Sequence, residues 1–394
     1  MNSKLTSSLL LLFLLGFYFS VGRLQGLIPL SGISIEKIGV LILLTLLIVM
    51  KFRTFIEKNE KKIIYSFFLL FIAFRFWWAF FSDVMQTSDS KYYLDQAIKM
   101  TQGEPLLSLY KQTGPSVIAS LFMWLSGVNS YIVGVIPIFI FSCLEIFLLY
   151  KLTRMFFGFI PALISVLLIG FWPEHIVYSN IVSNSLYQGV LLLLFAYFFH
   201  IGLRVNRSRL RIALFLFSGL FAAMAQYMRA TSLIFMISFL FIYLVSKTNW
   251  RCIFLVLTGF VIGTLPILVF NYKNIGIVSF SPSQFSGYSL LIGTNLSSRG
   301  HYYETFGQEV DEEVEKLVRE GKYVNSNLNI LDKNRVATNM KIKNILKNPI
   351  EFVKVAVEYK MPIFWADGAS FTWSLQEVPL VRKFPNWSAG VNLE

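Results

Sequence analysis

The sequence predicts an all-α polytopic membrane protein, on the evidence of its composition, its long apolar runs and the positions of its basic residues. Of the 394 residues, 55% are hydrophobic and only 14% are charged, whereas a soluble domain carries about 25% charged residues. Apolar runs such as "YIVGVIPIFIFSCLEIFLLY" are continuous and long enough to cross a bilayer as helices. They lack the period-two alternation of membrane β-barrel strands, so helices are expected.

Nine apolar segments follow one another along the chain and are expected to cross the membrane, which takes about 17–25 residues each. The first follows Lys4 and is interpreted as a signal-anchor helix, because "YFSVGRLQG" offers a poor cleavage site. The second is short in its apolar core. The spans are expected near residues 8–28, 38–50, 63–81, 130–150, 156–172, 185–203, 212–228, 232–246 and 252–272.

A further apolar piece, residues 116–127, is predicted to lie on the outer membrane surface as an interfacial helix. At 1.5 Å per residue it reaches only about 18 Å, which is less than the ~30 Å hydrocarbon core. Basic residues favour the cytoplasmic side. The loops near Lys51, Lys151, Arg204 and Lys247 all fall on that side only if residues 116–127 do not cross.

This orientation predicts two domains. Residues 1–272 form a transmembrane domain with external loops at 82–115 and 173–184, and residues 273–394 form an extracytoplasmic C-terminal region. The second loop contains no Lys or Arg, as expected for an external loop. The candidate functional residues should therefore gather at the outer face of the membrane.

The net charge of +13 does not indicate a nucleic-acid partner, because the basic residues cluster in short loops between apolar runs. Cys143 and Cys252 lie inside apolar segments, where thiols usually act as small hydrophobes. Neither a disulfide framework nor a metal cluster is indicated. Glu145 lies in the inner half of its span, within reach of the interface near Lys151, and is expected to be structurally paired or protonated.

The polar stretch "TSDSKYYLDQAIKM", residues 87–100, is the first candidate site. Tyr93, Leu94 and Ala97 share one face of a predicted helix, and Asp89 stands just before it. An Asp at this position can cap the helix by accepting backbone N–H bonds. The helix dipole also keeps such a carboxylate ionised, which is the state that a general base needs.

"SDSKYYLDQAIKMTQGEPL" resembles the first external loop of C-type (GT-C) glycosyltransferases. More narrowly, it resembles the bacterial relatives of dolichyl-phosphate-mannose protein mannosyltransferases and of lipid A aminoarabinose transferase, in glycosyltransferase family 39. There, an Asp opens the loop, a Tyr-containing helix and a Gly follow, and a Pro-initiated surface helix comes next. The matching elements here are Asp89, Tyr92, Tyr93, Gly103 and "GPSVIASLFMWLSG".

Three later segments resemble the same families in the same order. "FWPEHIVYSNIVSNSLYQGVLLLL" resembles the second external loop, "GLFAAMAQYMRATSLIF" a helix that ends with Arg on the outer side, and "FSGYSLLIGTNLSSRGHYY" a Gly-Asn-rich stretch. The resemblance covers most of residues 63–303. It implies transfer of a sugar from a polyprenyl-phosphate donor to an envelope glycan, lipid or protein hydroxyl, at the extracytoplasmic side of a bacterial plasma membrane.

The resemblance makes Asp89 the candidate general base, while cations near the outer surface are candidates to hold the donor phosphate. Arg229 comes first and Lys91 second, although each can be an ordinary interface or helix-face residue. Arg75 is a third candidate, since an intramembrane Arg is costly and often functional, yet it can also snorkel outward. No metal or other cofactor is expected, although Asp83 with Asp89 offers an alternative ligand pair.

The candidates for substrate binding are Tyr93 and three second-loop residues: Glu174, His175 and Asn184. Asn184 stands where the family usually has Asp or Glu, which puts a two-carboxylate mechanism in doubt. Glu174 and His175 are the nearest ionisable groups that can substitute. The chain also ends soon after Trp387, where relatives commonly continue into further helices, as expected of a short branch of the family or a truncated product.

Other functions remain open on the sequence alone. A transporter or flippase of lipid-linked sugars would place its site near the midplane on internal repeats, whereas the polar groups here gather at the outer edge. A polysaccharide polymerase or ligase would lack the Asp-Tyr loop followed directly by a surface helix. An inactive relative acting as a scaffold is consistent with Asn184.

Overall fold

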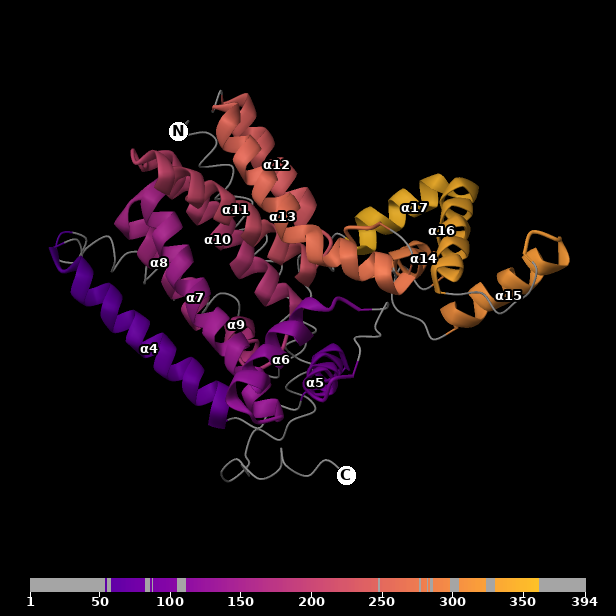
Figure 1. Cartoon of the computed structure of the whole chain (residues 1–394), viewed down its shortest axis with the longest axis horizontal. Helices are drawn as coiled ribbons and strands as arrows, with labels where there is room; N and C mark the ends of the chain where they lie inside the picture. The colour runs from indigo at the N-terminus through magenta and orange to yellow at the C-terminus, as the bar shows by residue number, and fades with distance from the viewer. Residues whose placement is uncertain are drawn as a thin grey trace. The chain divides into compact units, whose positions relative to one another are not determined.

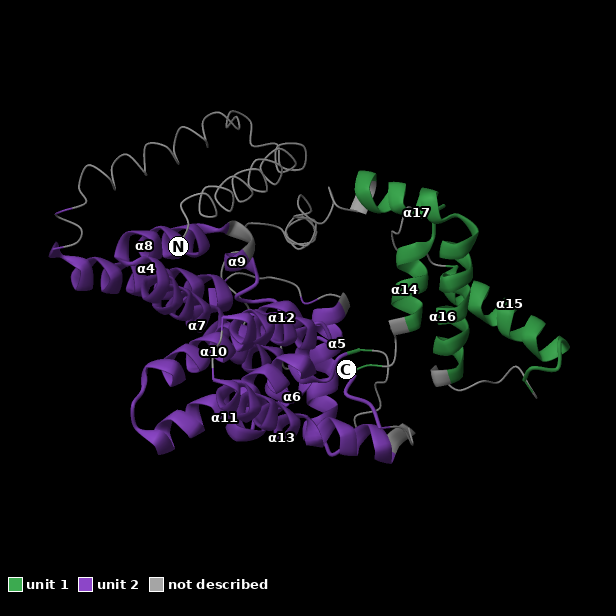
Figure 2. Cartoon of the chain, turned by 90° about the horizontal axis from the view of Figure 1, so that it is seen from above, with its two compact units in different colours: residues 1–45, 109–111, 283–372 green, residues 46–108, 112–282, 373–394 purple. Residues whose placement is uncertain are grey.

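All regular elements of the described residues are helical in the computed structural model (Figure 1). The structure describes residues 54, 58–81, 86, 88–104, 111–246, 249–275, 278–281, 283, 286–297, 305–323 and 330–360. The chain divides into two compact units (Figure 2). The larger comprises residues 46–108, 112–282 and 373–394, and the smaller residues 1–45, 109–111 and 283–372.

Five helices of the larger unit are long and apolar enough to cross a membrane by length and composition: α4 (Glu60–Phe81), α7 (Tyr131–Phe157), α10 (Asn184–Arg204), α11 (Ser208–Met228) and α13 (Trp250–Ile275). They confirm five predicted helices. Two more predicted spans are helical but shorter: α8 (Phe159–Phe171) and α12 (Ser232–Val245). The first two predicted spans lie outside the described residues. The all-α polytopic class is confirmed, while nine spans remain a prediction.

Close packing of α11 on α13 depends on glycines. A Cβ on Gly219 would meet the carbonyl oxygen of Val256, and a Cβ on Gly259 would meet that of Leu216. Small residues allow membrane helices to approach closely enough for backbones to touch. On the other side of α11, Ser218 donates a hydrogen bond of 2.8 Å to the carbonyl oxygen of Phe195 in α10. These contacts fix the position of the end of α11.

Two further helices of the larger unit pack against its long helices: α5 (Ser88–Thr101) and α6 (Gly114–Ser126). As predicted, the apolar face of α5 is buried, and it shares one core with α6, α7, α10 and α11. Pro115 lies in the first turn of α6, and the cap residue Gly127, whose φ of 68° is left-handed, follows its last residue. With 13 residues it is too short to cross the membrane. Trp124 and Leu125 on its outer face are exposed, as befits an interfacial helix.

The smaller unit contains α14 (Ser286–Thr294), α15 (Phe306–Arg319), α16 (Ile330–Lys347), α17 (Pro349–Val355) and the π-helix η1 (Ala356–Lys360). The amphipathic pattern "EVDEEVEKLVREG" predicts a helix that ends at Gly321. α15 ends at Arg319, two residues earlier, and Gly321 follows it with a left-handed φ of 72°. The predicted helix break at Pro349 separates α16 from α17. Its extracytoplasmic location remains a prediction.

Candidate functional site

The first turn of α5 carries Asp89, whose side chain is exposed. The helix begins at Ser88, so Asp89 lies inside the first turn rather than just before the helix. Asp89 therefore stays beside the positive N-terminal end of the helix dipole. Neighbouring Ser90 is buried and donates a hydrogen bond to the Gln86 side chain, which donates in turn to the carbonyl oxygen of Asn180 at 2.7 Å. The start of α5 is therefore tied to the second loop.

Tyr93 lies one helical turn after Asp89, on the same side of α5. Its side chain is only 1% exposed, and its hydroxyl donates a 3.3 Å hydrogen bond to Gln112 Oε1. Burial raises the pKa of Tyr93 far above its ordinary value; the negative charge of Asp89 adds to this, and the positive charge of Arg229 opposes it. The phenol therefore stays protonated at neutral pH. The charges of Asp89 and Arg229 both act on it.

A chain of hydrogen bonds links Tyr93 to Arg229, and we call its five members the Tyr93–Arg229 network. Gln112 Oε1 accepts one hydrogen bond from the Tyr93 hydroxyl and a second, of 3.3 Å, from Asn184 Nδ2. Ser185 Oγ donates to Asn184 Oδ1 at 3.3 Å, and one guanidinium nitrogen of Arg229 donates to Ser185 Oγ at 3.0 Å. Residues from α5, the segment before α6, the start of α10 and the end of α11 thus meet in one place.

Backbone contacts hold Arg229 in position at the end of α11. The residue has an extended backbone, with φ −159° and ψ 131°, and its N–H donates to the carbonyl oxygen of Ala225. Ser232 Oγ donates to the Arg229 carbonyl oxygen, while Gln188 Nε2 donates to both Thr231 and Ser232 hydroxyls. The turn from α11 to α12 is therefore fixed to α10.

The start of α6 also packs on the end of α11. A Cβ on Gly114 would lie 2.7 Å from Met228 Sδ and 2.8 Å from the carbonyl oxygen of Tyr227. Because Gln112 comes two residues before Gly114 and Arg229 directly follows Met228, this contact brings both ends of the network together.

The Arg229 guanidinium is exposed, and no described carboxylate forms an ion pair with it. Within the described part of the chain, its side chain makes one hydrogen bond, to a neutral hydroxyl. Since a guanidinium has five N–H donors, most of its donors can still bind an anion. Arg229 therefore has the properties required to hold a phosphate.

Arg75 does not join this network. Its side chain is fully buried, and its terminal nitrogens each donate at 3.1 Å, one to the carbonyl oxygen of Ser142 and one to that of Ile169. It therefore binds α4 to α7 and α8 and does not snorkel outward. These are contacts of a structural residue, and a role in donor binding has no geometric support. Nε of Arg75 has no hydrogen-bond partner among the described residues.

His175 lies in the short helix α9 (Pro173–Val177), and its Nδ1 is 3.0 Å from Glu145 Oε2. Glu145 therefore takes part in a structural pair, as expected, and its partner comes from the second loop. The reason is the length of α8, which with 13 residues rises only about 20 Å. The second loop consequently begins beside the middle of α7, where Glu145 lies. Nothing links His175 to the Tyr93–Arg229 network among the described contacts.

The structure gives fewer contacts for the remaining candidates, Glu174, Asp83 and Lys91. Glu174 belongs to α9, but its side chain lies outside the described residues, as does all of Asp83. Lys91 is exposed and has no described partner. It lies two residues from Asp89 on a helix, so the two side chains point to different sides. No group of three His, Cys, Asp or Glu side chains forms in the described part of the chain, and a metal-free site stays a prediction.

Sequence reasoning missed Gln112 and Ser185, which join the candidates to one another. A polar residue directly before the Thr-Gly-Pro start of α6 is a weak signal for Gln112. Ser185 follows Asn184 in the first turn of α10, where side chains commonly bond to groups at the helix end. Neither pattern identifies the more distant partners, because Tyr93 and Arg229 belong to other parts of the chain.

Residues 114–272 match the sequence model of a family described as dolichyl-phosphate-mannose-protein mannosyltransferase. This range begins at the first residue of α6 and includes Asn184, Ser185 and Arg229, whereas α5 with Asp89 precedes it. No curated protein and no solved structure matches the chain.

Proposed function

We propose, from the premise that this chain is a multi-pass membrane glycosyltransferase of the GT-C type and similar to glycosyltransferase family 39, that it transfers a sugar from a polyprenyl-phosphate donor to an extracytoplasmic hydroxyl. The observation that carries the proposal is the convergence of Tyr93, Asn184 and Arg229 in one hydrogen-bonded network beside Asp89. The Asp89 carboxylate and the Arg229 guanidinium both act on the Tyr93 phenol. A carboxylate can take a proton from an attacking oxygen, and a guanidinium can stabilise a departing phosphate.

In the proposed reaction, Asp89 accepts the proton of the acceptor hydroxyl while that oxygen attacks the anomeric carbon. The bond between the anomeric carbon and the phosphate oxygen breaks, and the electron pair leaves with the lipid phosphate. Arg229 stabilises the charge that develops on the phosphate, since charge-assisted hydrogen bonds to phosphoryl oxygens are strong. Asp89 then loses its proton to water, which restores the starting state.

Tyr93 and Asn184 serve as positioning residues in this scheme. The buried Tyr93 phenol keeps its proton and orients the Gln112 amide, which in turn holds Asn184. Asn184 is neutral, so the proposal needs a single catalytic carboxylate. His175 lies beside Glu145 instead of the network and has no assigned step.

The side of the membrane and the acceptor class belong to the proposal as well. Basic residues at the opposite ends of α7 and α10 support an extracytoplasmic site in a bacterial plasma membrane. An envelope glycan, a lipid or a protein hydroxyl can each act as acceptor. The transmembrane region 1–272 and the extracytoplasmic region 273–394 remain the proposed domains.

The decisive experiment gives membranes carrying the protein a radiolabelled polyprenyl-phosphate monosaccharide, starting with mannose, the sugar named in the family description. Asp89→Asn should lower sugar transfer by about 100-fold or more, because a general base contributes about 10²–10⁴-fold. Glu104→Gln is the matched control, since Glu104 is an exposed carboxylate of the same loop. Transfer that persists unchanged in Asp89→Asn would refute the assignment of the base.

A separate experiment tests the orientation. Single cysteines at Glu104 and Arg209 occupy exposed positions that the proposal places on opposite sides of the membrane. A membrane-impermeant thiol reagent added to intact cells should label Glu104→Cys and spare Arg209→Cys until the cells are opened. The reverse pattern would place the candidate site on the cytoplasmic side and overturn the proposed location.

A further inference from the structure

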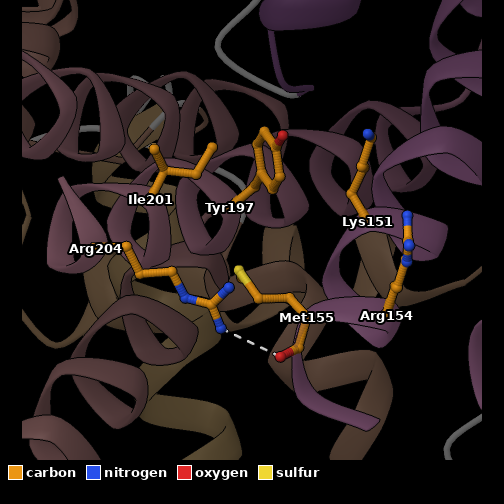
Figure 3. Close-up of a pocket in the computed structure, with 6 residues that line it drawn as sticks. All are labelled: Lys151, Arg154, Met155, Tyr197, Ile201 and Arg204. Atoms are coloured by element: carbon orange, nitrogen blue, oxygen red, sulfur yellow. Dashed lines mark hydrogen bonds between the residues drawn. The ribbon is translucent and has the colours of Figure 1, made fainter. Parts of the chain in front are cut away.

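A second site lies at the other end of the membrane helices. A pocket of about 420 Å³ opens between α7 and α10 (Figure 3). Its lining residues are three cations, one tyrosine and two apolar side chains: Lys151, Arg154, Arg204, Tyr197, Met155 and Ile201. Nothing in the proposed glycosyl transfer uses this pocket.

The pocket is remote from the Tyr93–Arg229 network. Asn184 is the first and Arg204 the last of the 21 residues of α10. At 1.5 Å per residue, this amounts to about 30 Å, the thickness of the hydrocarbon core. The pocket therefore lies at the opposite membrane face, next to the basic loops.

Two of its three cations lack an acidic partner. Among the described residues, Lys151 makes only a cation–π contact with Phe147, with Nζ 5.2 Å from the ring centre. Arg204 donates one hydrogen bond of 3.2 Å to the carbonyl oxygen of Met155 (Figure 3). Arg154, by contrast, forms an ion pair with Glu60 at 2.6 Å. The pocket thus has a net positive charge and several N–H donors that no described side chain uses.

The remaining lining residues favour a lipid over a soluble anion. Met155 and Ile201 give the pocket an apolar side, and Tyr197 has the amphipathic ring that suits a membrane interface. Basic pockets between membrane helices bind the head groups of anionic lipids. A free phosphate ion would use the cations but would leave the apolar side uncovered.

We propose that this pocket binds the phosphate group of an anionic glycerophospholipid in the adjacent leaflet, with Lys151 and Arg204 as its main contacts. Glycerol and the first acyl carbons lie against Met155 and Ile201. Arg154 has a smaller part, because Glu60 already neutralises it. The site is distinct from the donor site, so the protein takes lipid phosphates at both membrane faces.

Native mass spectrometry of the full-length protein in detergent tests this inference, with phosphatidylglycerol as the probe and phosphatidylcholine as the neutral comparison. Lys151→Gln and Arg204→Gln should each weaken phosphatidylglycerol binding about fivefold, as expected for one cation at a charged lipid surface. Arg209→Gln, which removes one exposed charge from the same face outside the pocket, should leave binding within about twofold.

Three results would overturn the proposal. Equal weakening by Arg209→Gln would reduce the effect to general surface charge. Equal binding of phosphatidylcholine would remove the requirement for an anionic lipid. Millimolar inorganic phosphate that displaces all bound phosphatidylglycerol from the wild-type protein would identify a soluble anion as the ligand. Thermal unfolding of each variant shows whether it is folded, and Lys151→Gln loses no ion pair to any described carboxylate.

Discussion

Two arginines of the larger unit were candidates for the same task, and the structure puts them in opposite environments. Arg229 caps the end of α11, and its exposed guanidinium bonds, among the described residues, only to a hydroxyl. Arg75 is completely buried in α4 and donates to backbone carbonyl oxygens of α7 and α8. The same chemical group is thus available to a ligand in one region and occupied by the protein in the other.

This difference shows why charge alone does not identify a binding residue in a membrane protein. An arginine inside the bilayer must find acceptors within the protein, because no water is there to satisfy it. The carbonyls of Ser142 and Ile169 fill that role for Arg75 and hold three helices together. At the membrane edge, water solvates Arg229 until an anion replaces it.

The largest effect should come from the buried arginine. Arg75→Ala removes two charge-assisted hydrogen bonds and leaves a cavity between α4, α7 and α8, so we expect a loss of about 3–4 kcal/mol in the free energy of unfolding. Thermal and denaturant unfolding in detergent measures this loss. Arg229→Ala should change the stability by less than about 0.5 kcal/mol. Equal stabilities of the two variants would break the comparison between these regions.

The exposed arginine should instead affect transfer. Arg229→Gln keeps a hydrogen-bond donor but removes the charge, and we expect sugar transfer, measured as kcat/KM, to fall by about 30–100-fold. Arg229→Lys keeps the charge but loses the planar fork, so it should recover part of the activity. Full activity in Arg229→Gln, in a protein that unfolds at the wild-type temperature, would remove Arg229 from the donor site.

Sequence analysis predicted the helices and the gathering of candidates at one edge better than it predicted their contacts. Long apolar runs and loop charges located α7, α10 and α11, and amphipathic periodicity identified the buried face of α5. These features depend on local pattern, which a single sequence contains. Asp89, Tyr93 and Arg229 were identified from the residues and a resemblance, and their mutual proximity came only with the structure.

The incorrect and missing predictions depend on the depth and rotation of helices. α4 is apolar around most of its surface, so its pattern does not show which side Arg75 faces. The partner of Glu145 was not predicted, because the short α8 sets the depth of His175. Gln112 has no pattern of its own, and its importance arises from side chains on two other helices.

Gln112 offers a smaller test of the network. Gln112→Ala removes the acceptor shared by Tyr93 and Asn184, so both side chains lose a fixed orientation. We expect kcat to fall about fivefold to tenfold with little change in stability, which is the size of one or two neutral hydrogen bonds. Gln102→Ala, at an exposed position of the same loop, serves as the control. A change in the unfolding temperature without a change in kcat would make Gln112 purely structural.

The smallest effect on stability should come from Glu313, a partly exposed carboxylate in the smaller unit. Glu313 of α15 has a side chain that is 17% exposed and bonds to Lys343 of α16 at 3.0 Å and to Lys316 at 3.4 Å. Burial alone would raise the pKa of Glu313, but the hydrogen bonds and charges of the two lysines outweigh it and lower the pKa below its ordinary value of 4.5.

A lowered pKa means that the stability from Glu313 is fully present above pH 4.5 and is lost as the pH falls through the folded-state pKa. Glu313→Gln should therefore speed amide hydrogen exchange in α15 by about twofold to fivefold at pH 7, the range of a mostly solvated ion pair. After correction for the intrinsic rates, the difference from wild type should shrink as the pH falls below 4.5. Glu315→Gln, on an exposed position of α15, should have no such effect. A Glu313→Gln difference that stays constant down to pH 3 would show that the lysines contribute through packing, because a contribution from charge must vanish when the carboxylate is protonated.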